Sequence, residues 1–122
     1  IADICFQFAI LTKNENRLIG DMVIIFTGHD RMQVEVGCTL NKAFQGKGYA
    51  TDALTAMVIY FFMTLKKHRI VASIDPRNTA SIRLIERLGF KKEAHFKESY
   101  FLRGEWVDDI IYAMLDKDWG NK

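Results

Sequence analysis

Residues 45–51 read Gln45-Gly46-Lys47-Gly48-Tyr49-Ala50-Thr51 and stand between an alternating segment and a long apolar helical pattern. Glycines in such a turn let successive backbone N–H groups converge on an anion at the N-terminus of the following helix. We therefore expect a loop that binds phosphate or pyrophosphate. A glycine-rich turn without a ligand is the alternative that these residues leave open.

Two familiar phosphate loops do not fit the spacing of this segment. A Walker loop requires a glycine at position 41, which is Asn, and Ser or Thr after Lys47, which is followed by Gly48. A dinucleotide fingerprint would use Gly46 and Gly48, but its third glycine position holds Thr51. Both classes of nucleotide site are excluded.

Three strands are predicted ahead of the loop. Apolar runs at 5–11 and 18–26 end in short polar turns, and residues 32–40 alternate with a period of two. Short polar turns between such runs favour an antiparallel meander. The alternating segment places five apolar residues on one face: Met32, Val34, Val36, Cys38 and Leu40.

A helical period begins at Ala50 and continues to Leu65, before the basic group Lys66-Lys67-His68. A buried strand is predicted over 69–74. A second helix follows, capped by Asn78 or Thr79 and ended by Gly89. Its expected buried residues are Ile82, Ile85 and Leu88, and the first helix is expected to bury Ala50, Leu54, Met57, Val58, Phe61, Phe62 and Leu65.

The last two strands are predicted at about 94–102 and 107–115, around a turn at 103–106. The element order is therefore three strands, a helix, a strand, a helix and two strands. A helix between the third and fourth strands requires a crossover, so this is an α/β fold with a mixed sheet (α+β) that contains one parallel pair.

Composition limits the class of protein. The 122 residues are 49% hydrophobic with a net charge of +2, which predicts one globular domain over 1–122 and argues against a nucleic-acid partner. The longest apolar stretch, Ala53–Leu65, has 13 residues, too few for a membrane span. Cys5 and Cys38 form no CxxC motif, so we expect a reduced, cytoplasmic protein.

Metal chemistry and a covalent intermediate are both disfavoured. His29, His68 and His95 are isolated and lack metal-ligand spacing, so no metal is expected. Cys38 lies in an apolar strand without a neighbouring histidine, which is typical of an inert core thiol rather than a catalytic nucleophile.

Three blocks in the right order carry a resemblance to a known family. Residues 45–50 satisfy the pattern Gln/Arg-x-x-Gly-x-Gly/Ala and resemble the acetyl-CoA pyrophosphate loop of the GCN5-related N-acetyltransferases (GNAT). Residues 78–90 resemble the N-x-x-S-x-x-L-x-E-x-L-G-F segment of the subgroup that acetylates the N-termini of ribosomal proteins. Residues 104–108, with Asp118-Trp119, are typical of that subgroup too.

The resemblance implies how acetyl-CoA is held. It implies a sheet splayed after the third strand, where the backbone of Cys38, Thr39 and Leu40 would bind the pantetheine arm. Asn78 would contact the cofactor from the far side of the gap. The pyrophosphate would be bound by the amides of the loop, with Lys47 reaching a phosphate; these residues are Gln45, Gly46, Lys47, Gly48, Tyr49, Ala50 and Thr51.

Acetyl transfer requires an amine without its extra proton, so a base is needed. Glu35, in the otherwise apolar third strand, is the candidate, and a solvent-facing strand glutamate is the alternative. The tyrosine that the family uses as general acid is replaced by Ile85. Ser81 is the substitute proton donor to the leaving sulfur, and a helix cap is its alternative role.

We therefore expect an acetyl-CoA-dependent N-acetyltransferase that acts on a primary amine, which by resemblance is a protein or peptide N-terminus. A small amine (a polyamine or an antibiotic), a CoA-binding module without catalysis and a ligand-free interaction domain are the alternatives. Expected partners are acetyl-CoA and the amine, with no membrane, and homodimer formation is left open. The resembled fold has a further strand and two helices before residue 1, so we expect this chain to lack its N-terminal part.

Overall fold

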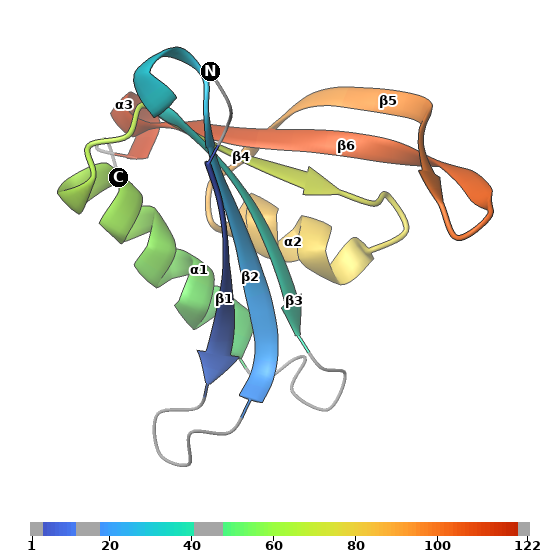
Figure 1. Ribbon diagram of the computed structural model, residues 1–122, viewed down its shortest axis with the longest axis horizontal. Coiled ribbons are helices and arrows are strands. Elements are labelled where there is room, and N and C mark those ends of the chain that lie inside the picture. The colour runs from blue at the N-terminus through green and yellow to red at the C-terminus, as the bar shows by residue number, and fades with distance from the viewer. Residues whose placement is uncertain (1–3, 12–17, 41–47, 120–122) are drawn as a thin grey trace.

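The computed structural model describes residues 4–11, 18–40 and 48–119. Six strands and two main helices follow the predicted order, with a short 3-10 turn (His29–Arg31) and a short terminal helix in addition (Figure 1). The α/β class is therefore confirmed. The elements are β1 (Ile4–Leu11), β2 (Leu18–Thr27), β3 (Gln33–Leu40), α1 (Tyr49–Ile59), β4 (Arg69–Ile74), α2 (Thr79–Arg87), β5 (Lys91–Leu102), β6 (Glu105–Leu115) and α3 (Asp116–Trp119).

All six strands form one mixed sheet in the order β1-β2-β3-β4-β6-β5. The first three strands are the predicted antiparallel meander. The crossover through α1 places β4 parallel to β3, and the pairs β4–β6 and β5–β6 are antiparallel. The predicted parallel pair is thus confirmed, and it lies in the middle of the sheet.

The apolar core lies on one side of this sheet, which we call the helix face. Alternate strand residues point to it, among them Val34 on β3 and Ile70 on β4, both fully buried. Leu54 and Phe61 of α1 and Leu84 of α2 belong to the same buried cluster, and Trp119 of α3 packs against it. All three helices therefore cover the same side of the sheet.

The other side of the sheet, which we call the open face, carries more polar residues. Glu35 is in register with Ile25 on β2 and Val71 on β4, so these three side chains share that face. Ser73, two residues beyond Val71, shares it as well. None of the helices in the described part of the chain packs on the open face.

The first helix does not continue as an α-helix to Leu65, and that prediction was wrong. From Tyr60 to Thr64 it widens into π-type turns, and the N–H of Leu65 donates to the carbonyl of Tyr60 at 3.0 Å. The consecutive residues Phe61 and Phe62, both within this wider turn, are buried in the core. The expected stripe is otherwise confirmed where side chains are described.

The second helix is capped by Asn78 rather than by Thr79. The Asn78 Oδ1 atom accepts the backbone N–H of Ser81 at 3.1 Å. The prediction of its buried face was partly wrong: Leu84 and Ile85 are buried, whereas Ile82 and Leu88 are half-buried at the edge of the core. The contact of α2 with the core is therefore centred on the adjacent residues Leu84 and Ile85.

The final hairpin is longer than predicted. Strand β5 begins at Lys91 and β6 at Glu105, so the turn shrinks to Arg103-Gly104. Both turn residues have positive φ, 50° and 82°, as a type I′ hairpin requires. Residues 105–109 pair with β5 alone, and this arm extends beyond β4 (Figure 1).

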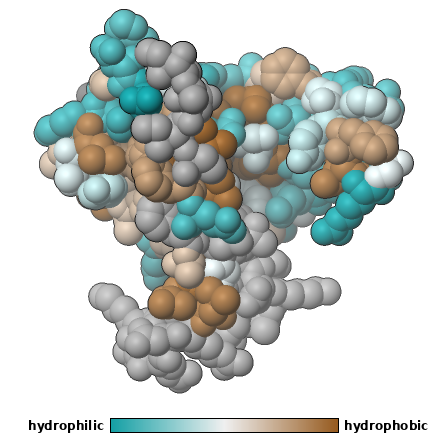
Figure 2. All heavy atoms as spheres, in the orientation of Figure 1, coloured by the Kyte–Doolittle hydropathy of each residue, from teal (hydrophilic) through white to brown (hydrophobic). Residues whose placement is uncertain are grey.

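The arm exposes apolar groups at its outer end (Figure 2). Trp106 is 59% exposed and packs edge-on against Phe101, with 5.2 Å between ring centroids.

Asp108 stabilises an irregular stretch of β5, because its carboxylate accepts the Glu98 N–H at 2.9 Å and contacts His95 Nε2 at 2.8 Å. These bonds, the backbone one above all, lower the pKa of Asp108. The carboxylate therefore supports the hairpin.

Candidate functional site

The strands β3 and β4 diverge partway along their length. Their pairing runs from Gln33↔Arg69 to Val36↔Ala72. Beyond it, among the strands that the structure describes, residues 37–40 pair only with β2, and Ser73 and Ile74 of β4 pair only with β6. Figure 1 shows the two strands separating toward their carboxyl ends. This is the splay that the resemblance implies.

The predicted pantetheine-binding residues form one edge of this splay. Cys38 and Thr39 are in register with Met22 and Asp21 of β2, and Leu40 with Gly20. On the side toward β4, no described strand pairs with them. An extended ligand with amide groups can pair with such an edge as an additional strand would. The geometry therefore fits the predicted use of their backbone.

The N-terminus of α1 follows directly from the predicted loop. Gly48 caps the helix with φ 83°, and the first intrahelical bond runs from Asp52 N to Gly48 O at 3.0 Å. The N–H groups of Tyr49, Ala50 and Thr51 precede that bond and have no acceptor in the helix. A Cβ at Gly48 would meet no atom of the described residues within 4 Å. Gln45, Gly46 and Lys47 lie outside the described residues.

Asn78 and Ser81 lie at the N-terminus of α2. The Asn78 carbonyl is used by the cap, so its amide NH₂ is the group left for a ligand. The cap belongs to Asn78, and Ser81 contributes only its backbone N–H to it, so the Ser81 hydroxyl is not the cap. Both helices start after the carboxyl ends of the parallel strands β3 and β4, where ligands of α/β sheets bind.

Glu35 lies on the open face, one residue before the β3–β4 pairing ends. Its side chain is half-buried, and within the described ranges no side chain forms an ion pair or hydrogen bond with it. Ser81 belongs to α2 on the helix face, so the two predicted catalytic residues lie on opposite sides of the sheet. Glu35 therefore borders the splay from the open face and Ser81 borders it from the helix face, and the two side chains are not in contact.

Ile85, which replaces the family's tyrosine, is buried in the core cluster. Its apolar side chain holds α2 on the sheet and has no proton to donate. The neighbouring Glu86 instead accepts the hydroxyl of Tyr112 at 2.9 Å, and burial together with this carboxylate raises the pKa of Tyr112. The role of Ile85 is therefore to pack α2 against the sheet.

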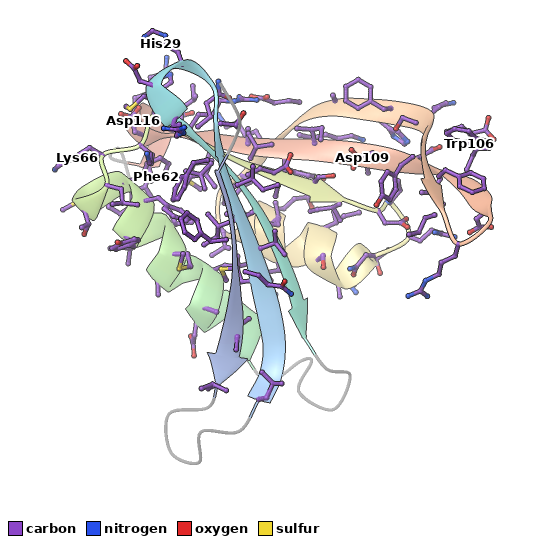
Figure 3. The ribbon with its side chains drawn as sticks, viewed as in Figure 1. His29, Phe62, Lys66, Trp106, Asp109 and Asp116 are labelled. Atoms are coloured by element: carbon purple, nitrogen blue, oxygen red, sulfur yellow. The ribbon has the colours of Figure 1, made fainter. Side chains whose placement is uncertain are left out.

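One polar pair beside the splay was missed by the sequence analysis. The Ser73 hydroxyl on β4 donates to Asp109 Oδ1 on β6 at 2.5 Å. Figure 3 shows Asp109 on β6, at the side of β4. The alternation of Arg69–Ile74 could have placed Ser73 on the Glu35 face, but no sequence signal links it to a residue 36 positions away.

A second charged group joins the β4–α2 turn to the hairpin arm. Arg77 donates to Asp75 Oδ2 and to Glu105 Oε1, both at 2.8 Å. The guanidinium lowers the pKa of Asp75, and the two carboxylates raise the pKa of Arg77. The charges are already paired with one another, which favours a supporting role for this group.

In the described ranges no three His, Cys, Asp or Glu side chains come together in a way that could hold a metal ion. None of the helices there is long and apolar enough to span a membrane.

A family model described as the acetyltransferase (GNAT) domain matches residues 2–91. Among curated proteins, the chain is 37% identical over 114 residues to probable N-acetyltransferase YjcK of Bacillus subtilis. It is 34% identical over 117 residues to the ribosomal protein uS5-alanine N-acetyltransferase of Escherichia coli. Each match covers 93% of this chain, which spans 63% and 59% of the lengths of these relatives, less than two thirds of either.

Solved structures agree with this result. A GNAT-family acetyltransferase from Bacillus anthracis has a TM-score of 0.83 at 34% identity, covering 91% of this chain and 66% of that one. A mutant of the spermidine N-acetyltransferase SpeG from Vibrio cholerae has a TM-score of 0.85 at 25% identity, covering 96% and 69%. The mixed sheet therefore belongs to a fold known from experiment.

Proposed function

Because the chain belongs to the GCN5-related N-acetyltransferase family, we propose that the whole protein transfers the acetyl group of acetyl-CoA to a primary amine. GNAT acetyltransferases use acetyl-CoA as co-substrate. The observation that carries the proposal is the edge of β3 beyond Val36, which no described strand covers on the side toward β4, together with the N-terminus of α1 that follows the cap Gly48. Residues 1–122 belong to the acetyltransferase domain of this enzyme, and the proposed location of the enzyme is the cytoplasm.

Each part of the site has a role in this proposal. The backbone of Cys38, Thr39 and Leu40 binds the pantetheine arm, and the loop from Gln45 to Thr51 binds the pyrophosphate. The α1 N–H groups and helix dipole favour a dianion there. The Asn78 amide contacts the cofactor from the α2 side. When bound, acetyl-CoA supplies an acyl group activated as a thioester.

Glu35 is proposed as the base that takes a proton from the acceptor amine, directly or through one water. Its half-buried position on the open face, and the absence of an ion-paired cation beside it among the described residues, support this role. Ser81 is proposed as the hydrogen-bond donor to the departing sulfur. The demand on that donor is small, because a thiol with a pKa of about 8.5 leaves readily as thiolate.

The acceptor that we favour is a protein N-terminal amine. The sequence blocks at 78–90 and 104–108 and the relative that acts on ribosomal protein uS5 support it. A polyamine is the second candidate, supported by the structural similarity to a spermidine N-acetyltransferase.

The test is calorimetric titration of acetyl-CoA into the intact protein and into Gly48→Asp, which places a carboxylate at the proposed pyrophosphate position. We expect binding to weaken roughly 100-fold or more. Gly104→Asp is the matched control, because Gly104 has a similar φ of 82° and equally open space but lies on the hairpin arm. It should bind acetyl-CoA normally.

Turnover is then compared for wild type and Glu35→Gln with an N-terminal alanyl peptide and with spermidine. Loss of roughly 100-fold or more in kcat with normal acetyl-CoA binding supports Glu35 as base. Unchanged turnover would eliminate it. A folded protein that does not bind acetyl-CoA would overturn the proposed function itself.

A further inference from the structure

The Ser73–Asp109 pair lies on the open face of the sheet, beside the splay of β3 and β4. Ser73 is the first β4 residue on the open face beyond the last β3–β4 pair, Val36↔Ala72. Ser73 is exposed and Asp109 half-buried, so the hydroxyl is accessible while the carboxylate behind it is partly covered. The pair therefore borders the splay on the side opposite to α1 and α2.

The same face carries Glu35. Glu35 is in register with Val71, and Ser73 follows two residues later on the same strand. With strands about 4.8 Å apart and a rise of about 3.3 Å per residue, a regular sheet would separate the Cα atoms of Glu35 and Ser73 by about 8 Å, and the divergence of β4 beyond Ala72 adds to this spacing. Side chains at that spacing can contact one small group from two sides.

The direction of the hydrogen bond decides what Ser73 can offer. An ionised aspartate has no proton to donate, so the Ser73 hydroxyl must donate to Asp109. Its single proton is thus in use, and its lone pairs remain free to accept. A hydroxyl held in this way favours an N–H donor, such as an amine or ammonium group, and disfavours a carbonyl.

We propose that Ser73 binds the acceptor amine by accepting one of its N–H groups, and that Asp109 acts as a positioning residue that holds the hydroxyl in this orientation. The inference rests on the proposed acetyl transfer and assigns the amine a place in it. Glu35 and Ser73 then hold the amine from two strands, with Glu35 left to take the proton.

A purely structural role predicts a different behaviour. Hydrogen bonds at exposed positions contribute little to stability, and truncating them would alter folding slightly but not the recognition of one substrate. The measurements must therefore separate the amine from acetyl-CoA. They must also include a readout that does not depend on turnover.

The experiment uses the intact protein as wild type, Ser73→Ala, Ser73→Thr and Asp109→Asn, with trialanine amide and spermidine as amine probes. We expect Ser73→Ala to raise KM for the amine about tenfold and Asp109→Asn several-fold, with acetyl-CoA affinity unchanged. Ser73→Thr keeps the hydroxyl and should restore KM to within about threefold of wild type. Calorimetric titration of the amine into the protein saturated with CoA should show the same order.

Glu93→Gln is the matched control, because it removes a carboxylate paired with Arg69 of the same face. It should leave the KM for the amine unchanged. If Ser73→Ala and Asp109→Asn behave like this control while wild type acetylates a probe, the inference is overturned and the proposed function stands. If wild type binds no acetyl-CoA or acetylates neither probe, the proposed function fails and the inference fails with it.

Discussion

The two faces of the sheet are made by the same strands but differ in what they carry. On β3 and β4 the helix face presents Val34 and Ile70, which are completely buried. On the same strands the open face presents Glu35 and Ser73, which remain accessible. An alternation of period two thus separates the residues that hold the fold from those that can meet a substrate. Substitutions on the helix face should act mainly on stability.

Phe61→Ala is the strongest test of this division. Phe61 is 1% exposed and packs edge-on against Phe26, with ring centroids 6.1 Å apart. Losing the ring should reduce the free energy of unfolding by about 3–5 kcal/mol, measured by urea denaturation. Met63→Ala, on the same π-type turn but 54% exposed, should cost less than about 0.5 kcal/mol. Equal losses would contradict the assigned core.

Tyr112→Phe tests the polar contact on the helix face. It removes the hydrogen bond to Glu86 and should cost about 1 kcal/mol at pH 7, because the exposed Glu86 can bind water instead. The raised pKa of Tyr112 means that the folded state holds the phenol proton more tightly. Its stabilisation is full below the unfolded pKa of about 10 and is lost as pH rises through the folded pKa. Denaturation curves of wild type and Tyr112→Phe should therefore differ at pH 7 and converge at pH 11.

Glu93→Gln should have the smallest effect on stability. Arg69 donates two hydrogen bonds to Glu93, at 2.6 and 2.8 Å, and this lowers the pKa of Glu93. Because the pair is solvent-accessible, we expect a loss of only about 0.5 kcal/mol. That contribution is present above the unfolded pKa of about 4.3 and is lost as pH falls through the folded pKa. Lys92→Gln is the neighbouring control; a larger loss for Lys92 would contradict the assignment.

Much of the architecture could be predicted from local patterns. The change in hydrophobic period at residue 50, from strand-like to helical, separated the first strands from the first helix. The crossover rule then predicted the parallel pair. The loop and the block at 78–90 indicated the family, which the comparisons confirm. The predicted roles of Glu35, Ser81 and the cofactor-binding residues stay predictions.

Other features depend on contacts that a local pattern does not contain. The π-type turns after Ile59 and the early start of β5 at Lys91 each follow from how an element meets its neighbours. Element ends are where competing local preferences are nearly equal in energy. Tertiary packing then decides between them.

By itself, the sequence determined which side chains alternate, where the helical period begins and which glycines free the chain, because these depend on residues close together along the chain. Only the tertiary structure decided that β3 and β4 separate after Val36 and Ala72, and that Ser73 meets Asp109 across 36 positions. Sheet order, register and twist arise from many distant contacts at once. The candidate site lies at the carboxyl ends of β3 and β4, and those distant contacts determine where the two strand ends lie.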